Sequence, residues 1–156
     1  MLSYRLVSSR VRTLSLIEHG ANMPEKLPPP ITLAMVVCDA IWVDPTGGKT
    51  SLLGLFSQFG AGTFPTTYPL ICVHVCMTGA HGRIPLELRL VDADDENDPL
   101  VQVPEEVDFP NRGSMIEWDV EMENVEFPSP GDYCLQLYAG AEFVLERRIT
   151  VYQAED

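Results

Sequence analysis

The closing stretch of the chain, from Phe127 to Tyr152, constrains the fold more than any other. It begins with a corner at Pro130-Gly131 and continues as a segment in which apolar and polar residues alternate. A short loop at Ala139-Gly140-Ala141 separates this segment from a second one of the same kind. Alternation with period two between turn residues is typical of a β-hairpin. We expect Tyr133 to be a corner tyrosine, whose hydroxyl bonds a backbone group nearby.

Similar short segments, separated by turn residues, recur along the chain. The 13 prolines and 11 glycines favour turns over long helices, and no helix is expected after Met23. The pattern predicts one all-β domain over residues 31–153, an antiparallel immunoglobulin-like β-sandwich of about seven to eight strands. The expected strands are 31–43, 50–59, 70–78, 86–90, 100–103, 115–122, 133–138 and 142–152.

Side-chain parity predicts which face of each strand lies in the core. Arg147 falls on an inward parity, so we expect a bulge there or a place at the rim of the sandwich. Pro104 is expected to stop an edge strand, because proline cannot donate to a β-ladder. The inward side chains are expected to be Ile71, Val73, Val75, Met77, Leu86, Leu88, Leu90, Ile116, Trp118, Val120, Met122, Tyr133, Leu135, Leu137, Phe143, Leu145, Ile149 and Val151.

The segment 33–43 is apolar on both parities. Asp39 interrupts it and predicts a bend or bulge. Since a surplus of apolar outer surface usually marks an interface, we expect a protein partner, and homodimerisation is one way to cover this surface. The expected function is a non-enzymatic binding or structural module that acts through protein–protein contacts.

Residues 1–30 are expected to form an N-terminal extension outside the domain, either disordered or an over-called start at which Met23 is the true first residue. Residues 1–22 carry Arg5, Arg10 and Arg12 against Glu18 alone. A transit-like peptide is therefore one alternative. A docking helix is another, and its loosely apolar face would consist of Leu6, Val7, Val11, Leu14 and Ile17. Residues 23–30 are Pro-rich and predict an extended lead-in.

The formal net charge of −13 argues against nucleic acid and anionic membranes as partners, since both are polyanions. No apolar run approaches the length of about 18 residues that spans a membrane. The N-terminus lacks the pattern of a secretory signal, which favours a cytoplasmic location. In that reducing compartment we expect the four cysteines to remain thiols.

Cys72, His74 and Cys76 alternate on one expected strand and so share one face. Thiolates and imidazole suit zinc, and Cys134 lies on the outer parity of a strand that we expect to be a neighbour. Strand residues two apart are separated by about 6.5–7 Å, too far for one zinc ion to bind Cys72 and Cys76 together. Cys72, His74 and Cys134 are therefore the candidate zinc ligands, and small buried thiols are the alternative.

An acidic turn offers candidate calcium ligands. Asp92, Asp94, Glu96 and Asp98 follow the spacing of the first ligands of an EF-hand loop. Val103 stands where that loop has its bidentate glutamate, and the flanks are expected strands. A calcium-dependent, C2-like binding domain is therefore one alternative function, and a solvated turn is the other interpretation.

No motif predicts catalysis. Gly48-Lys49-Thr50 resembles the end of a phosphate-binding loop, but Val43 occupies the place of that loop's first glycine. No serine lies in a nucleophile elbow. We therefore expect no enzymatic activity and no cofactor, and a metal-dependent enzyme remains a further alternative. The outward carboxylates Glu117, Asp119 and Glu121 are expected to face solvent.

Five short stretches carry a resemblance to a known family: Cys38-Asp39, Gly47-Gly48-Lys49, Leu53-Gly54-Leu55-Phe56, Phe64-Pro65 and Pro130-Gly131-Asp132-Tyr133. Through them, residues 31–152 resemble an uncharacterised set of bacterial domains with a small β-sandwich. The resemblance implies the fold and a bacterial cytosolic setting. It implies no activity, ligand or catalytic residue.

Overall fold

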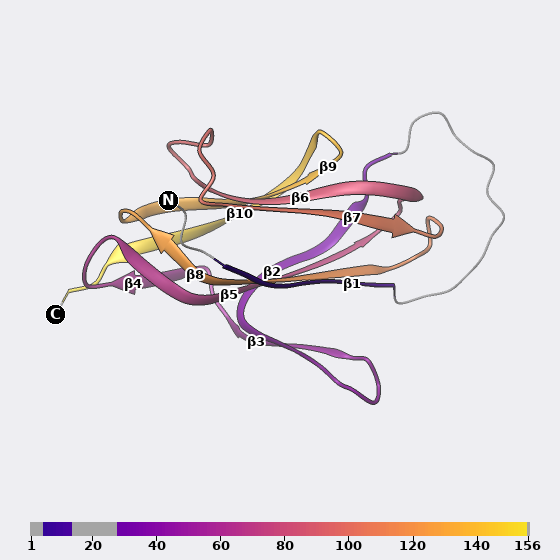
Figure 1. Ribbon diagram of the computed structural model, residues 1–156, viewed down its shortest axis with the longest axis horizontal. Coiled ribbons are helices and arrows are strands. Elements are labelled where there is room, and N and C mark those ends of the chain that lie inside the picture. The colour runs from indigo at the N-terminus through magenta and orange to yellow at the C-terminus, as the bar shows by residue number, and fades with distance from the viewer. Residues whose placement is uncertain (1–4, 14–27, 156) are drawn as a thin grey trace.

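The fold consists of two five-stranded β-sheets packed face to face (Figure 1). The computed structural model describes residues 5–13 and 28–155, with side chains from Ser8 onward. No helix in this part of the chain is long and apolar enough to cross a membrane. The predicted all-β class and two-layer packing are confirmed.

The strands divide between the sheets as follows. In spatial order, the first sheet contains β1 (Arg5–Thr13), β8 (Ile116–Phe127), β5 (Thr66–Thr78), β2 (Ile31–Val43) and β3 (Thr50–Leu55). The second sheet contains β4 (Gln58–Ala61), β10 (Glu142–Gln153), β9 (Gly131–Ala139), β6 (Gly82–Asp92) and β7 (Val101–Phe109). All neighbours pair antiparallel except β4 and β10, which are parallel.

The core lies between the two sheets, and the alternation in the sequence predicts it well. Trp118 in β8 and Val73 in β5 are fully buried, and so is Leu135 in β9. Phe143 is the exception among the predicted inward residues, since it is 53% exposed. A register shift between Phe143 and Leu145 turns its side chain outward, where its ring meets that of Tyr138 at 5.8 Å between centroids.

The N-terminal strand β1 corrects the expectation that residues 1–30 lie outside the domain. Arg5–Thr13 is a strand, not a helix, and pairs with β8 from Arg5 opposite Glu123 to Thr13 opposite Ile116. Arg10 and Arg12 stand opposite Asp119 and Glu117, so cationic side chains meet a row of carboxylates. The other predictions for residues 1–4 and 14–27 lie outside the described residues.

Ten strands are present in the described chain, instead of the expected seven to eight. Besides β1, the sequence pattern missed the division of 50–61 into β3 and β4, which join different sheets. It also placed the end of β7 too early, at Pro104. This strand continues to Phe109, because an edge strand has no outer neighbour that needs the missing N–H.

Strand β2 changes partner at the predicted bend. Residues up to Cys38 pair with β5, and residues from Cys38 onward pair with β3. Opposite Asp39 stands Gly54, whose φ is +70° and on which a Cβ would overlap the Asp39 carboxylate. We call the β2–β3 hairpin beyond this point, residues 40–55, the arm. It leaves the first sheet on the side away from the second sheet (Figure 1).

The closing hairpin has the predicted geometry. The Tyr133 hydroxyl donates to the carbonyl oxygen of Ser129 at 2.6 Å, as expected for a corner tyrosine. Arg147 lies at the rim between the sheets, where its Nη1 donates to the carbonyl oxygen of Met35 at 3.1 Å. The hairpin therefore closes the second sheet and contacts the first.

Candidate functional site

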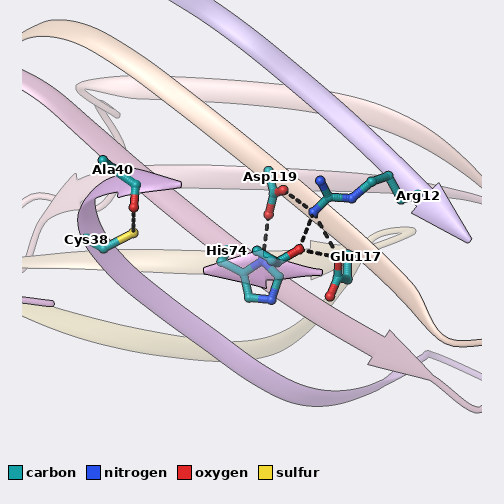
Figure 2. Close-up of polar contacts among 7 residues, drawn as sticks. Arg12, Cys38, Ala40, His74, Glu117 and Asp119 are labelled. Atoms are coloured by element: carbon teal, nitrogen blue, oxygen red, sulfur yellow. Dashed lines mark hydrogen bonds and ion pairs between the residues drawn. The ribbon is translucent and has the colours of Figure 1, made fainter. Parts of the chain in front are cut away.

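A cluster of charged side chains lies on the outer face of the first sheet, beneath the arm (Figure 2). His74 Nδ1 is 2.6 Å from Asp119 Oδ1, and both residues are buried. Arg12 contacts the other oxygen of Asp119 through Nη2 and donates to Glu117 Oε2 at 2.8 Å. Both carboxylates therefore contact the guanidinium of Arg12, and Asp119 also contacts the imidazole of His74.

Three adjacent strands bring this cluster together. Asp119 in β8 stands between Arg10 of β1 and His74 of β5, in one row across the sheet. Glu117 lies two residues from Asp119 and therefore points to the same outer face. Strand β8 is the neighbour of both β1 and β5. The cluster depends on β1 because this strand supplies Arg12, and the sequence pattern assigned β1 to an extension outside the domain.

The arm completes the cluster with one hydroxyl. Thr50, at the start of β3, accepts a hydrogen bond from Arg12 Nη2 at 3.0 Å and donates one to Glu117 Oε2 at 3.0 Å. These bonds fold the arm back over the strands β1 and β8. Asp119 is therefore buried and does not face solvent, which corrects the expectation for this carboxylate.

The cluster contains a His–Asp pair in which the imidazole contacts one carboxylate oxygen. Within the described part of the chain, His74 makes a hydrogen bond only to Asp119. Two cysteines of the same face, Cys72 and Cys76, each lie two positions from His74 along β5. Burial, followed by the charge of Glu117, raises the pKa of the Cys76 thiol. A protonated thiol is a poor nucleophile.

The candidate zinc ligands are not brought together. Cys72 and His74 lie in the first sheet and Cys134 in the second, so the prediction that their strands are neighbours is wrong. Strand β5 lies between β2 and β8, and the cross-strand partners of Cys72 are Cys38 in β2 and Glu121 in β8. Burial, followed by the charge of Glu121, raises the pKa of the Cys72 thiol to about 12. All four cysteines are free thiols.

The acidic turn forms hydrogen bonds both within itself and with β9. The Asp92 carboxylate accepts from the backbone N–H of Asp94 at 2.9 Å, and Glu96 Oε1 accepts from Gln136 at 3.3 Å. Among the described residues, no three His, Cys, Asp or Glu side chains are grouped closely enough to hold a metal ion.

An open recess of about 550 Å³ lies beside the edge of the second sheet. Its polar lining comes from Glu87, Glu105 and Glu106. Glu105 already accepts a hydrogen bond from Ser9 of β1 at 2.9 Å. Carboxylates and prolines dominate the lining, which contains no cationic side chain that would bind an anion.

The outer surface of the arm is apolar. Trp42, Leu53 and Leu55 are 53%, 56% and 61% exposed. Trp42 is the cross-strand partner of Ser51, and Leu53 lies two residues from Ser51, so Trp42 and Leu53 share a face. Thr50 belongs to the opposite parity, which faces the polar cluster. In the sequence, the apolar residues on both parities of 33–43 indicated an exposed apolar surface. They gave no sign that Leu53 and Leu55 of β3 contribute to it.

Comparison with known proteins assigns the chain to a family and leaves its activity open. A search of the curated proteins gave no match. The model of a family of unknown function (DUF6941) matches residues 33–152, which include all of the described strands except β1, the first two residues of β2 and the last residue of β10. Since this match spans most of the chain, the protein belongs to the family of unknown function DUF6941.

Proposed function

We propose that this protein is a non-enzymatic binding module that contacts a protein partner through the outer surface of the arm. The observation that carries the proposal is the exposure of Trp42, Leu53 and Leu55 on one projecting hairpin. Large apolar side chains gathered on an exposed surface are typical of interaction sites. Tryptophan is also enriched among the residues that dominate binding energy at interfaces.

The charge distribution supports the same surface. The whole chain has a net charge of −13, whereas the arm holds one acidic residue, Asp44, and one basic residue, Lys49. A partner therefore meets little charge repulsion at the arm. The polar bonds of Thr50 to Arg12 and Glu117 hold the arm in place for contact.

We also infer an immunoglobulin-like topology and a cytoplasmic setting. The tyrosine corner at Tyr133 and the paired strands β6, β9 and β10 support the topology. The four unpaired cysteines support a reducing compartment.

A second copy of the chain is the first partner to test. Light scattering over a range of protein concentrations should show association of the wild type that is weaker in a Leu53→Ser/Leu55→Ser variant, because this variant removes the part of the association that the arm contributes. Both leucines are exposed, so these changes should leave folding intact. A matched control is Gln102→Ser, an exposed position on β7 in the other sheet.

If the wild type is a strict monomer, the homodimer version is wrong, and the partner is a different protein. A photo-crosslinking residue at Ser51 should then give a crosslinked partner that a residue at Gln102 does not give. The crosslink should disappear in the Leu53→Ser/Leu55→Ser variant. Crosslinks that persist in this variant, or that appear equally at Gln102, would show that the arm is not the binding surface.

A further inference from the structure

The strand β1 is attached to the domain as a bound peptide would be. It lies at the edge of the first sheet and pairs with β8 alone. The family match covers residues 33–152 and therefore excludes it. Without β1, the edge of β8 would present unpaired backbone groups, which is a template for the addition of a strand.

The side chains of β1 and β8 complement each other on both faces. On the outer face, Arg12 contacts the carboxylates of Glu117 and Asp119. On the inner face, the indole Nε1 of Trp118 donates to the Ser9 hydroxyl at 2.8 Å, and this hydroxyl donates to Glu105. A fully buried indole requires such an acceptor. The β8 edge thus recognises a strand with serine inward and arginine outward.

The covalent connection permits this strand to pair with another molecule. Residues 14–30 join β1 to β2. A connection of that length spans at most about 3.3–3.6 Å per residue, or roughly 60 Å in all, which is enough to reach a neighbouring copy. Since the contacts of an exchanged strand are the same as those of the original, exchange costs little beyond the loss of freedom on association.

We propose that the β8 edge is a strand-acceptor site and that its occupant in trans is the β1 strand of a second copy, exchanged reciprocally. The resulting dimer has two-fold symmetry, with Arg12 of each copy bound to Glu117 and Asp119 of the other. The β8 edge is a different surface from the arm, so this proposal can be tested independently of the proposed function.

A disulfide at one β1–β8 pair distinguishes pairing within a chain from pairing between chains. Ser8 and Glu121 are direct cross-strand partners, within the Cα separation that a disulfide requires. A ¹⁵N-labelled Ser8→Cys variant and an unlabelled Glu121→Cys variant are mixed as full chains in a glutathione redox buffer. Exchange predicts a disulfide-linked peptide pair that joins residue 8 of the labelled chain to residue 121 of the unlabelled chain, with a yield that rises with protein concentration.

The controls separate exchange from random thiol chemistry. The Ser8→Cys variant mixed with Gln102→Cys should give no such pair, because Ser8 lies on the outer face of the first sheet and Gln102 on the outer face of the second. The double variant Ser8→Cys/Glu121→Cys should close within one chain, which shows that the pair can form a disulfide. If the double variant closes and the mixture gives no interchain pair above the control, the proposal is wrong.

Light scattering in the Leu53→Ser/Leu55→Ser background gives a second test that does not depend on a disulfide. Association through the arm is removed in this background. A dimer fraction that rises with concentration and dissociates slowly after dilution supports strand exchange. A strict monomer at every concentration overturns it, whatever the double variant does.

Discussion

The outer faces of the two sheets carry similar patterns and have different structures. On β5, Cys72 and His74 alternate outward, and on β9 Cys134 and Gln136 do the same. His74 is bonded to a carboxylate at 2.6 Å under the arm. Gln136 is 3% exposed, but its Nε2 makes only long bonds, at 3.3 Å and 3.4 Å, and its Oε1 has no hydrogen-bond partner among the described residues.

The difference arises from what covers each face. The first sheet is covered by the arm and flanked by β1, which together supply a hydroxyl and a guanidinium. On the outer face of the second sheet, Gln136 donates a hydrogen bond to Glu96 of the acidic turn. Buried charges are stable in a protein only when they are paired, so Arg12, Glu117 and Asp119 each contact an opposite charge, although Arg12 Nε has no hydrogen-bond partner among the described residues. On the second sheet the buried group is the neutral amide of Gln136, and its Oε1 remains without a hydrogen-bond partner among the described residues.

The largest expected effect comes from removal of the carboxylate that joins the cluster. Asp119→Ala leaves His74 and Arg12 facing each other without this anion, and loss of one partner from a buried ion pair costs about 3–5 kcal/mol. Urea unfolding followed by tryptophan fluorescence measures the change. The matched control on the other face is Glu146→Ala, an exposed carboxylate, with an expected loss below about 0.5 kcal/mol. Equal losses in the two variants would show that the faces do not differ.

The second prediction compares the thiols of the two faces at alkaline pH. Burial and Glu121 raise the pKa of Cys72 from its ordinary value of 9.0 to about 12. The folded state thus keeps this thiol protonated where the unfolded state ionises it. The contribution to stability is complete below pH 9 and is lost as the pH rises from 9 towards 12.

Cys72→Ala should therefore flatten the alkaline fall of the unfolding free energy, measured by urea unfolding across that pH range. Burial also raises the pKa of Cys134, and the nearby guanidinium of Arg148 opposes this effect. Cys134→Ala should flatten the curve less. Tyr68, whose pKa burial and the Asp39 hydrogen bond raise to about 12, remains in both variants and leaves a shared residual slope. A larger flattening in Cys134→Ala would reverse the comparison.

The sequence predicts the core well because alternation in a strand is a local property. Val73 and Trp118 are buried as their parity indicates, and Tyr133 forms the expected corner. The bend at Asp39 is also a local signal, since a charged residue interrupts an apolar segment. These features need no knowledge of which strands are neighbours.

The cluster could not be predicted because it depends on strand order. Arg12, Asp119 and His74 come from β1, β8 and β5, which are distant in sequence and adjacent only in the sheet. The arginines of the N-terminal segment were the available signal, because they alternate as a strand requires. Their acid-poor context instead suggested a transit-like peptide. Burial of Asp119 further depends on the arm, whose folded-back position is a tertiary property.

The third prediction concerns the attachment of the arm to the charged cluster that it covers. Thr50→Val keeps the shape of the side chain and removes the hydroxyl that joins the arm to Arg12 and Glu117. Hydrogen bonds to charged groups contribute about 1.5–3 kcal/mol, and partial exposure places the expected loss near the lower value. Faster hydrogen exchange in β3 should accompany it. Thr46→Val, at an exposed position in the turn of the same arm, should change neither quantity.

The smallest effect is expected on the second sheet. Gln136→Leu removes a buried amide whose Oε1 has no partner in the described chain and whose bonds to Glu96 and Glu146 are long. Replacement of a poorly satisfied buried polar group by an apolar one of similar size is nearly neutral or stabilising, so we expect a change within about 1 kcal/mol. Urea unfolding again measures it. A loss above about 2 kcal/mol would mean that Gln136 belongs to a polar network as complete as that of His74. The cover by the arm would then not be the reason why the two faces differ.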